Sequence, residues 1–508
     1  MGIGTFEEFN ELQVVAKSAE EGRLKEALNH ALKLLEKDPC HGGGLTLASY
    51  CLRRLGALVQ AYQFAKNGVR EFPEEAALWV NLGGAAQGLW LQDEAEASYR
   101  KALSLLKNPK HIEIVYLNLG ALAIDCGDFE EGEKWIRKLL ELRPDDKNTL
   151  GNLGFCYLAR REWKEGWRLY AKCVGSDWLP KIQYGTEPEW DGSTGRVVAV
   201  YEDQGVGDAI SFASVLPDAV KDCKRVILDC EPKLHGLFQR SFPNIRCYPT
   251  RRETGASGVI WEKPDRTIDA SIPLSQLGQF YRLTDESFPG TAYLKPCPVR
   301  AGMWGAYFRS RKRPVIGIAW TGGVAHTNAR FRALTLKQLL PIFKAVPNAH
   351  WVSLQYKDAS KEIAEFTREH RDVNLTQYRF ATLTPDYDDT AAMVASLDYV
   401  VCIQTAVGHL SGALGVPAAV LIPEHTTWRY AIGDTIPWYK SMTVVRQDKI
   451  DWRSAIDRVC SLLFAHFRKL SEGAGDDARN DGALRGNGGA VRPNGRGDHP
   501  ADGSIAPA

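Results

Sequence analysis

Small and apolar positions recur at a fixed interval through the first third of the chain. Ala27, Ala61 and Ala95 are each 34 residues apart, and Pro39 and Pro73 follow the first two alanines by twelve residues. A fixed period of this length indicates stacked copies of one small structural unit. Internal repetition is therefore the first feature that the pattern predicts.

The later copies repeat the same kinds of residue, and the spacing is that of the tetratricopeptide repeat, a helical hairpin. Small residues are expected where its two helices approach closely, and large ones such as Trp79 and Tyr157 are expected to fill the interface. We predict five repeats over residues 8–180, stacked as an α-solenoid whose concave face binds a protein; the alternative is a solenoid that only supports the next domain. The matching residues of copies three to five are Trp79, Leu82, Gly83, Leu119, Gly120, Pro144, Leu150, Leu153, Gly154, Tyr157 and Tyr170.

From about residue 185 the pattern changes to apolar runs of strand length alternating with helical spacing. This alternation predicts parallel sheets covered by helices. We expect two Rossmann-like halves, over 185–300 and 301–465, with a ligand in the cleft at the carboxyl ends of the strands. The predicted strands are Arg196–Tyr201, Arg225–Asp229, Val315–Trp320, His350–Leu354, Leu397–Cys402 and Leu421–Glu424.

The last segment, residues 471–508, is rich in Gly, Asn, Asp and Arg. Its only large aliphatic residues are Leu484, Val491 and Ile505. Such a composition cannot bury a core, so we expect a disordered tail.

Composition and charge exclude several classes of protein. Hydrophobic residues make up 44% and charged residues 25% of the chain, which is ordinary for globular proteins. The formal charge of +1 gives no field that would attract nucleic acid. The N-terminus has no signal-peptide pattern and no apolar run is long enough to span a membrane, so we expect a cytoplasmic protein without membrane insertion. The eleven cysteines are scattered and never form CxxC, which disfavours disulfides and a zinc site.

A glycine turn follows the first predicted strand. Gly205 and Gly207 would let the backbone approach a ligand closely, and Asp208 stands at the mouth of the next helix. The alternative is that Asp208 only caps the helix and complements its dipole.

A second loop, after the strand that begins the second half, carries Thr321 and Gly322 and then His326, Arg330 and Arg332. Glycines followed by fixed cations suit phosphate oxygens, which need backbone donors and positive charge. The alternative is a flexible surface loop with solvated arginines.

A third site candidate lies where a buried strand runs into a helix of small residues. Free backbone N–H groups there, at Thr405, Ala406 and Gly408, could hold a diphosphate. His409 by itself would more often be a hydrogen-bonded core residue than a catalyst. The loop over 425–434, with Trp428 and Arg429, would also overlook the cleft.

The stretches EDQGVGDAISFASVLP, IGIAWTGGVAHTNARFRALTL, WVSLQ and LDYVVCIQTAVGHLSGALGVP resemble the heptosyltransferase-like glycosyltransferases of GT-B fold, in the subgroup preceded by a tetratricopeptide array. The resemblance covers residues 185–465 and implies a nucleotide-sugar donor, no cofactor and no metal, with Asp208 as general base. Arg330 and Arg332 would stabilise the leaving diphosphate. The resemblance places the donor against Thr321, Gly322, Arg332, Thr405, Ala406 and Gly408, with His409 nearby.

The sequence departs from this family at Gln404, where the family has an aspartate that orients the donor sugar. Either the donor is not heptose or activity has been lost. Related two-part proteins resemble bacterial flagellin glycosyltransferases, in which the repeats hold flagellin. We therefore expect a glycosyltransferase that modifies a protein acceptor, flagellin being one candidate. The alternatives are an adaptor or secretion chaperone with a degenerate glycosyltransferase domain, and transfer to lipopolysaccharide.

Overall fold

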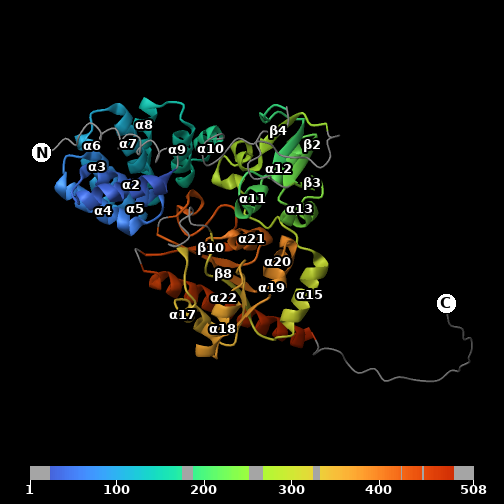
Figure 1. Cartoon of the computed structure of the whole chain (residues 1–508). Helices are drawn as coiled ribbons and strands as arrows, with labels where there is room; N and C mark the ends of the chain where they lie inside the picture. The colour runs from blue at the N-terminus through green and yellow to red at the C-terminus, as the bar shows by residue number, and fades with distance from the viewer. Residues whose placement is uncertain are drawn as a thin grey trace, which may run out of the picture.

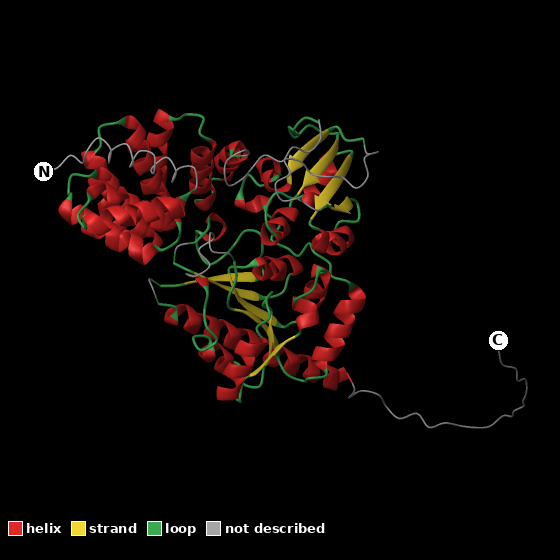
Figure 2. Cartoon of the chain, viewed as in Figure 1, coloured by secondary structure: helices red, strands yellow, loops and turns green. Residues whose placement is uncertain are grey.

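The computed structural model describes residues 23–173, 187–250, 267–323, 332–424, 426–448 and 451–484, with side chains described as far as residue 468. A helical N-terminal region lies beside the first of two α/β units, and the second unit lies across both of them (Figures 1 and 2). This confirms the predicted fold class, an α-solenoid followed by units with parallel sheets.

The solenoid is built of paired helices of 10 to 17 residues. The second to fifth predicted repeats are the pairs α3/α4, α5/α6, α7/α8 and α9/α10. Helix α2 belongs to the first predicted repeat, and the part of that repeat before residue 23 lies outside the described residues. The bounds are α2 Leu24–Lys37, α3 Gly42–Arg54, α4 Leu58–Glu71, α5 Ala76–Gly88, α6 Gln92–Leu105, α7 Pro109–Asp125, α8 Phe129–Leu142, α9 Lys147–Ala159 and α10 Trp163–Lys172.

Glycines allow the close approach of helices that the repeat pattern predicted. A Cβ atom on Gly83 would lie 2.6 Å from the Tyr99 ring, and one on Gly166 would lie 2.9 Å from the backbone nitrogen of Leu158. No larger residue fits at these two positions without moving a helix.

The large residues expected in the interface contribute less than predicted. Trp79 and Tyr157 are only half-buried, because each has a polar partner at the surface. The Trp79 indole donates to the Pro73 carbonyl at 2.8 Å, and the Tyr157 hydroxyl lies 2.8 Å from a Glu133 oxygen. Other aromatic side chains are buried instead: Tyr99, Trp135, Trp163, Trp167 and Tyr170.

The first helices of successive repeats pack on one another: α3 on α5, α5 on α7, and α7 on α9. This direct packing places the first helices on the inner side of the curve, so their exposed side chains form the concave face.

The first α/β half contains a four-stranded parallel sheet in the order β3-β2-β1-β4. Every residue of β1 is buried, as expected of a strand covered on both faces. The elements are β1 Val197–Tyr201, α11 Val206–Ala213, α12 Leu216–Asp222, β2 Arg225–Cys230, α13 His235–Ser241, β3 Arg246–Pro249, β4 Ala270–Pro273 and α14 Gly278–Tyr281.

The second half contains a six-stranded parallel sheet in the order β10-β9-β8-β5-β6-β7. In both sheets a ligand cleft is expected at the carboxyl ends of the strands. The elements are α15 Pro298–Arg309, β5 Val315–Ala319, α17 Leu340–Ala345, β6 His350–Ser353, α18 Ser360–Glu369, β7 Asn374–Gln377, α19 Arg379–Thr382, α20 Tyr387–Val394, β8 Tyr399–Ile403, α21 Ala406–Leu414, β9 Ala418–Ile422, β10 Met442–Arg446 and α22 Arg453–Leu484.

One hydrophobic core runs from the last two repeats into both α/β halves. Its centre is an aromatic cluster, in which the Trp163 ring lies 4.8 Å from Phe288 and the Trp167 ring 5.6 Å from Trp428. The Trp167 indole also donates to the Arg282 carbonyl at 2.8 Å. The solenoid is therefore joined to the halves by buried packing.

The C-terminal tail lies largely outside the described residues. Helix α22 continues to Leu484, past Ser471 where we predicted the tail to begin. The segment has no proline before Pro493, so nothing in its backbone chemistry interrupts a helix. No helix in the described part of the chain is long and apolar enough to cross a membrane. All eleven cysteines are free thiols, and most of them are buried.

Candidate functional site

Helix α11 begins the first wall of the candidate site. It follows β1 through a short turn whose Gly205 is the N-cap residue. Asp208 lies in the first turn of α11, and 34% of its side chain is exposed. Gln204, just before the turn, donates to the Tyr170 hydroxyl of the last repeat at 2.5 Å. The candidate base therefore stands at a helix N-terminus that is tied to the solenoid.

Helix α21 forms the opposite wall. The buried strand β8 ends at Ile403, and Thr405 is the N-cap residue of α21 with extended backbone (φ −145°). The Thr405 hydroxyl is buried and has no hydrogen-bond partner among the described residues. An N-terminal turn of this kind offers backbone N–H groups and a partial positive charge to an anion.

The two helices run side by side in the same direction. A Cβ atom on Gly207 would lie 3.2 Å from the Ala406 Cα and 3.3 Å from the His409 ring. Further along, the Tyr293 hydroxyl donates to the Ile210 carbonyl at 2.6 Å, while the Tyr293 N–H donates to the Ala413 carbonyl at 2.9 Å. Both positive helix ends consequently lie at one place, where the Asp208 side chain is 34% exposed, and we call this place the joint opening of α11 and α21.

The sequence predicted that Gly207 would approach a ligand, and the structure gives this glycine a different neighbour. The space beside its Cα is filled by the first turn of α21. Gly408 likewise has a packing role, since a Cβ atom there would lie 3.3 Å from the Cys402 sulfur. These two glycines bring secondary structure together.

Asp208 is paired across the two halves with Arg429, at 3.0 Å between Oδ1 and Nη1. The Arg429 guanidinium stacks on two rings, 4.6 Å from the Phe212 centroid and 4.5 Å from that of Trp428. Only 9% of its side chain is exposed, and its Nε has no partner among the described residues. The sequence placed Arg429 above the cleft and gave no sign of this ion pair.

Gln404 holds the loop that carries Arg429. Its amide nitrogen donates to the Thr427 hydroxyl at 2.6 Å, and its amide oxygen accepts from the Thr426 hydroxyl at 3.1 Å. An aspartate has a shorter side chain and no N–H, so it could not make the bond to Thr427. The backbone oxygen of Gln404 accepts from Arg332 at 3.2 Å, and burial lowers the pKa of the Arg332 guanidinium.

His409 is a buried residue of the interface between α11 and α21. Its two ring nitrogens lie 3.3 Å from the Tyr439 hydroxyl and 3.2 Å from the Tyr430 hydroxyl. Burial, with a smaller contribution from Arg429, lowers its pKa to about 3. It is therefore a neutral core histidine, in agreement with the alternative that the sequence left open.

Thr321 and Gly322 follow strand β5, and Gly322 lies next to Thr405, the N-cap residue of α21. Gly322 packs against the Thr405 methyl group so closely that a Cβ atom would not fit. The Gln355 amide, in its favourable orientation, donates to the Thr321 carbonyl at 3.0 Å. Arg330 and His326 lie outside the described residues. The structure thus brings together Asp208, Arg429, Thr405, Thr321 and Gly322.

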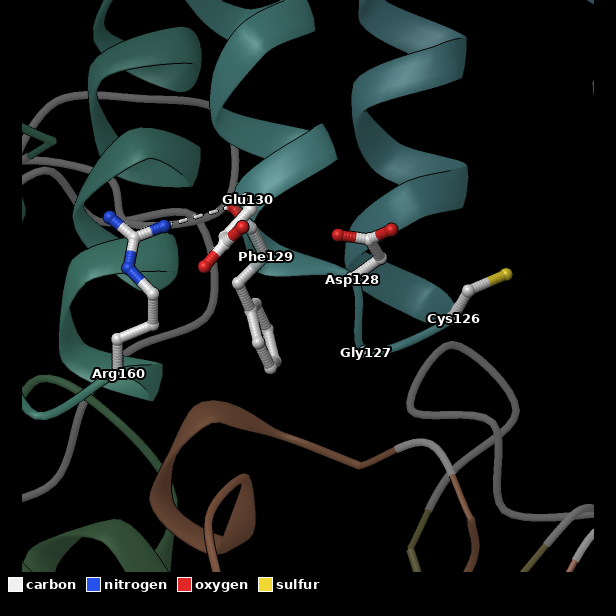
Figure 3. A pocket seen from close by; sticks show the side chains of 6 residues that line it. All are labelled: Cys126, Gly127, Asp128, Phe129, Glu130 and Arg160. Atoms are coloured by element: carbon white, nitrogen blue, oxygen red, sulfur yellow. Dashed lines mark hydrogen bonds between the residues drawn. The ribbon is translucent and has the colours of Figure 1, made fainter.

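The solenoid carries a cavity of about 410 Å³ at the turn between α7 and α8 (Figure 3). Two of its polar side chains, Asp128 and Arg160, already have structural partners. The Asp128 carboxylate caps α8 by accepting from the Glu131 N–H at 3.0 Å, and Arg160 donates to the Phe129 carbonyl at 3.1 Å. The cavity is lined by Cys126, Gly127, Asp128, Phe129, Glu130 and Arg160.

The concave face of the solenoid combines apolar and basic side chains. Ile114 and Leu117, one turn apart on α7, are 51% and 38% exposed. On α3 the guanidinium groups of Arg53 and Arg54 both lie 5.7 Å from the Tyr50 ring. Exposed apolar residues grouped on one face are typical of a protein-binding surface.

Fold and site together define a tetratricopeptide solenoid joined to two parallel α/β halves with a polar joint between them. Residues 114–146 match the tetratricopeptide repeat family. Protein FlbA of Caulobacter vibrioides is 28% identical over 443 residues, and the match covers 81% of this chain and 71% of FlbA. This match extends through the solenoid into the α/β halves.

Shorter matches are confined to about a third of the chain. The tetratricopeptide repeat-containing protein trd-1 of Caenorhabditis elegans is 28% identical over 148 residues, which are 29% of this chain and 17% of that protein. Among solved structures, the type IV pilus biogenesis factor PilW is 17% identical with a TM-score of 0.31, covering 34% of this chain and 77% of PilW. The Thermus thermophilus protein TTC0263 is 20% identical with a TM-score of 0.29, covering 34% of this chain and 91% of that protein.

Proposed function

We propose that this protein is a cytoplasmic glycosyltransferase that moves a sugar from a nucleotide sugar to a protein held by its solenoid. The observation that carries the proposal is the position of Asp208. Its carboxylate is one-third exposed at the joint opening of α11 and α21, beside the N-terminus of α21. A carboxylate next to an anion site is the arrangement that glycosyl transfer requires.

Each part of the joint opening has a role in the proposed reaction. Asp208 accepts the proton of the acceptor hydroxyl as that oxygen attacks the anomeric carbon. The bond from that carbon to the phosphate oxygen breaks, and the phosphate leaves with the electron pair. The N-terminus of α21 and the half-buried Arg332 stabilise the negative charge of the leaving group.

The solenoid supplies the acceptor in this proposal. Ile114 and Leu117 are exposed on the concave face, and the buried aromatic cluster fixes this face relative to Asp208. An acceptor bound there would be held at a constant distance from the base, which lowers the entropic cost of bringing them together. Flagellin is the acceptor to test first, because the sequence resembles flagellin glycosyltransferases.

The central experiment is intact-mass spectrometry of flagellin and other secreted proteins from cells that lack this chain. Restoring the wild-type chain should restore a mass increase on the acceptor. Asp208→Asn should bind the acceptor normally and leave its mass unchanged, because the amide cannot take a proton at neutral pH. Full modification by Asp208→Asn would remove Asp208 as the base.

Recruitment is tested separately by replacing Ile114 and Leu117 with serine. We expect this double variant to bind purified flagellin at least about tenfold more weakly in calorimetry, because two contacts of about 1 kcal/mol each are lost. Val299 and Met303 on α15, which are 70% and 69% exposed, provide a matched control when both are replaced by serine. Equal binding by the two double variants would place the acceptor elsewhere.

A second candidate is a binding module without catalysis, such as an adaptor or secretion chaperone. Two observations favour it: Asp208 is already paired with Arg429, and Gln404 is engaged in holding a loop. Calorimetry against a panel of nucleotide sugars separates the two functions. A binding module should show no heat with any of them, whereas the enzyme should bind one class.

A further inference from the structure

Arg429 is a buried cation at the joint opening of α11 and α21. Within the described part of the chain its ion pair is with Asp208, at 3.0 Å. Its other close neighbours are the faces of Phe212 and Trp428, which attract the guanidinium but accept no hydrogen bond from its edge. A guanidinium has five N–H donors, so this arrangement leaves donor capacity unused.

Two buried polar atoms at this opening have no partner among the described residues: the Arg429 Nε and the Thr405 hydroxyl. A buried polar atom without a partner is unfavourable, so each of these two atoms would be stabilised by a hydrogen bond to a ligand. An anion oxygen is a hydrogen-bond acceptor for either of them. The N-termini of α11 and α21 open at the same place and add positive potential.

We propose that Arg429 is the anion-binding residue of this site and that it exchanges partners. Without ligand it pairs with Asp208; with a phosphate group in the joint opening it binds the phosphate and releases Asp208. The identification of the phosphate as part of a nucleotide sugar rests on the proposed function. The exchange itself rests on the ion pair and the unpartnered donors.

The exchange couples donor binding to the base. While the Arg429 guanidinium lies 3.0 Å from Oδ1 of Asp208, that oxygen is engaged and is not available to the hydroxyl of an acceptor. Once phosphate takes the guanidinium, the Asp208 carboxylate is free to accept the acceptor's proton. Arg429 thus acts as a positioning residue for Asp208 and as a ligand of the donor.

Gln404 supports this exchange of partners by Arg429. Its amide bonds to Thr426 and Thr427 fix the loop immediately before Trp428 and Arg429. The guanidinium can then change partners without displacement of the loop backbone. The need to hold this loop accounts for the glutamine at position 404, where the heptosyltransferase-like family that the sequence resembles has an aspartate.

The test is calorimetric titration of the full chain with inorganic pyrophosphate at low salt. We expect Arg429→Gln to weaken binding at least about tenfold, and Asp208→Asn to tighten it at least about fivefold, because a competing carboxylate is removed. Arg379→Gln, which removes an exposed arginine paired with Asp358 on the second half, serves as the control and should bind like the wild type.

The double variant Asp208→Asn with Arg429→Gln distinguishes partner exchange from a general loss of negative charge. If Asp208 acts through Arg429, the gain from Asp208→Asn disappears when Arg429 is already absent. A gain that persists in the Arg429→Gln background would overturn the proposal. So would a wild-type chain that binds no pyrophosphate, or an Asp208→Asn variant that binds it no more tightly.

Further measurements distinguish failure of the partner exchange from misfolding of a variant and from failure of the proposed glycosyltransferase function. Should Arg429→Gln fail to fold, Arg429→Lys retains the charge without the planar fork, and Asp208→Asn alone still tests the competition. If the pyrophosphate measurements agree with the exchange while no acceptor gains mass, the anion site stands and the glycosyltransferase function fails. If mass is transferred but Arg429→Gln binds pyrophosphate normally, the exchange fails and the enzyme stands.

Discussion

His409 shows how the environment of one residue decides its chemistry. Its imidazole lies between two buried tyrosine hydroxyls and a few ångströms from Gly207 of the opposite half. Burial lowers its pKa to about 3. A histidine in this state cannot supply a proton near neutral pH, so its contribution is to the stability of the joint between α11 and α21.

This burial predicts a pH dependence of stability. The unfolded imidazole has a pKa near 6.5 and the folded one a pKa of about 3, so between these values the unfolded chain binds one more proton. His409 therefore contributes its full stability above pH 6.5, and the contribution falls by about 1.4 kcal/mol for each unit below it. Chemical denaturation between pH 7 and 5 gives the free energy of unfolding at each pH. This free energy should fall less steeply with decreasing pH for His409→Gln than for the wild type. Identical slopes would mean that the ring is solvated.

Single-residue chemistry could be predicted from the sequence only where a motif follows a strand. Asp208, Thr321 and Thr405 were chosen in this way, because parallel strands end at the same edge of their sheet, and the structure places each of them shortly after a strand. The partner of Asp208 was not found, since Arg429 reaches it from a loop more than two hundred residues further along the chain. The bonds of Gln404 depend on the same loop.

At the scale of elements, the close packing of α11 on α21 is the feature that joins the two halves. Gly207 makes it possible, because the nearest atom to a Cβ there is the Ala406 Cα, which belongs to backbone and cannot move aside. Both helices are short, of 8 and 9 residues. Their stability therefore depends on this contact more than on their own propensity.

Replacing Gly207 with alanine should separate the two helices. The substitution favours helix formation by at most about 1 kcal/mol, but the clash should cost more, giving a net loss of about 1–3 kcal/mol. Gly302→Ala in α15, where nothing lies within 4 Å of the added atom, is the matched control and should stabilise the chain. Thermal unfolding measures both variants, and an equal rise in Tm for the two would show that the helices do not touch.

The sequence predicted most of the strands whose residues are buried throughout, but it missed β4, which is buried at every position, and it placed β9 at 421–424, overlapping the observed strand at residues 421 and 422. β1, β5, β8 and β9 are continuous apolar runs with every residue buried, which is the signal of a central parallel strand. β7 escaped prediction because it lies at the sheet edge with the sequence Asn374–Gln377, mostly polar and only one residue buried. The strand conformation of a short edge segment such as β7 depends on its pairing with the adjacent strand, here β6, and not on its own hydrophobic pattern.

At the scale of the whole molecule, the solenoid and the α/β halves share a core. The repeat pattern predicted that large aromatic residues fill the interface between the helices of a repeat. The last repeat instead directs Trp163 and Trp167 towards Phe288, Trp428 and Trp438. Sequence periodicity identifies the repeats but does not reveal that the final one faces another domain.

Because the core is shared, we expect a destabilising substitution in the last repeat to loosen the packing of α11 and α21 at the joint opening. Trp167 is 1% exposed and its ring packs on Trp428, the residue next to Arg429. Trp167→Ala should cost about 3–5 kcal/mol. It should also raise amide hydrogen exchange in α11 and α21, because the Trp428 ring that supports the Arg429 guanidinium loses its own support.

Trp135→Ala is the matched comparison. This residue is 6% exposed and belongs to a separate core within the solenoid. Its loss should raise exchange in the neighbouring repeats and leave α11 and α21 unchanged. Hydrogen exchange measured by mass spectrometry therefore distinguishes a solenoid that folds as one unit with the α/β halves from one that is only attached to them. Equal protection of α11 and α21 in the two variants would mean that the aromatic cluster does not transmit the change, and that the solenoid and the joint opening are mechanically independent.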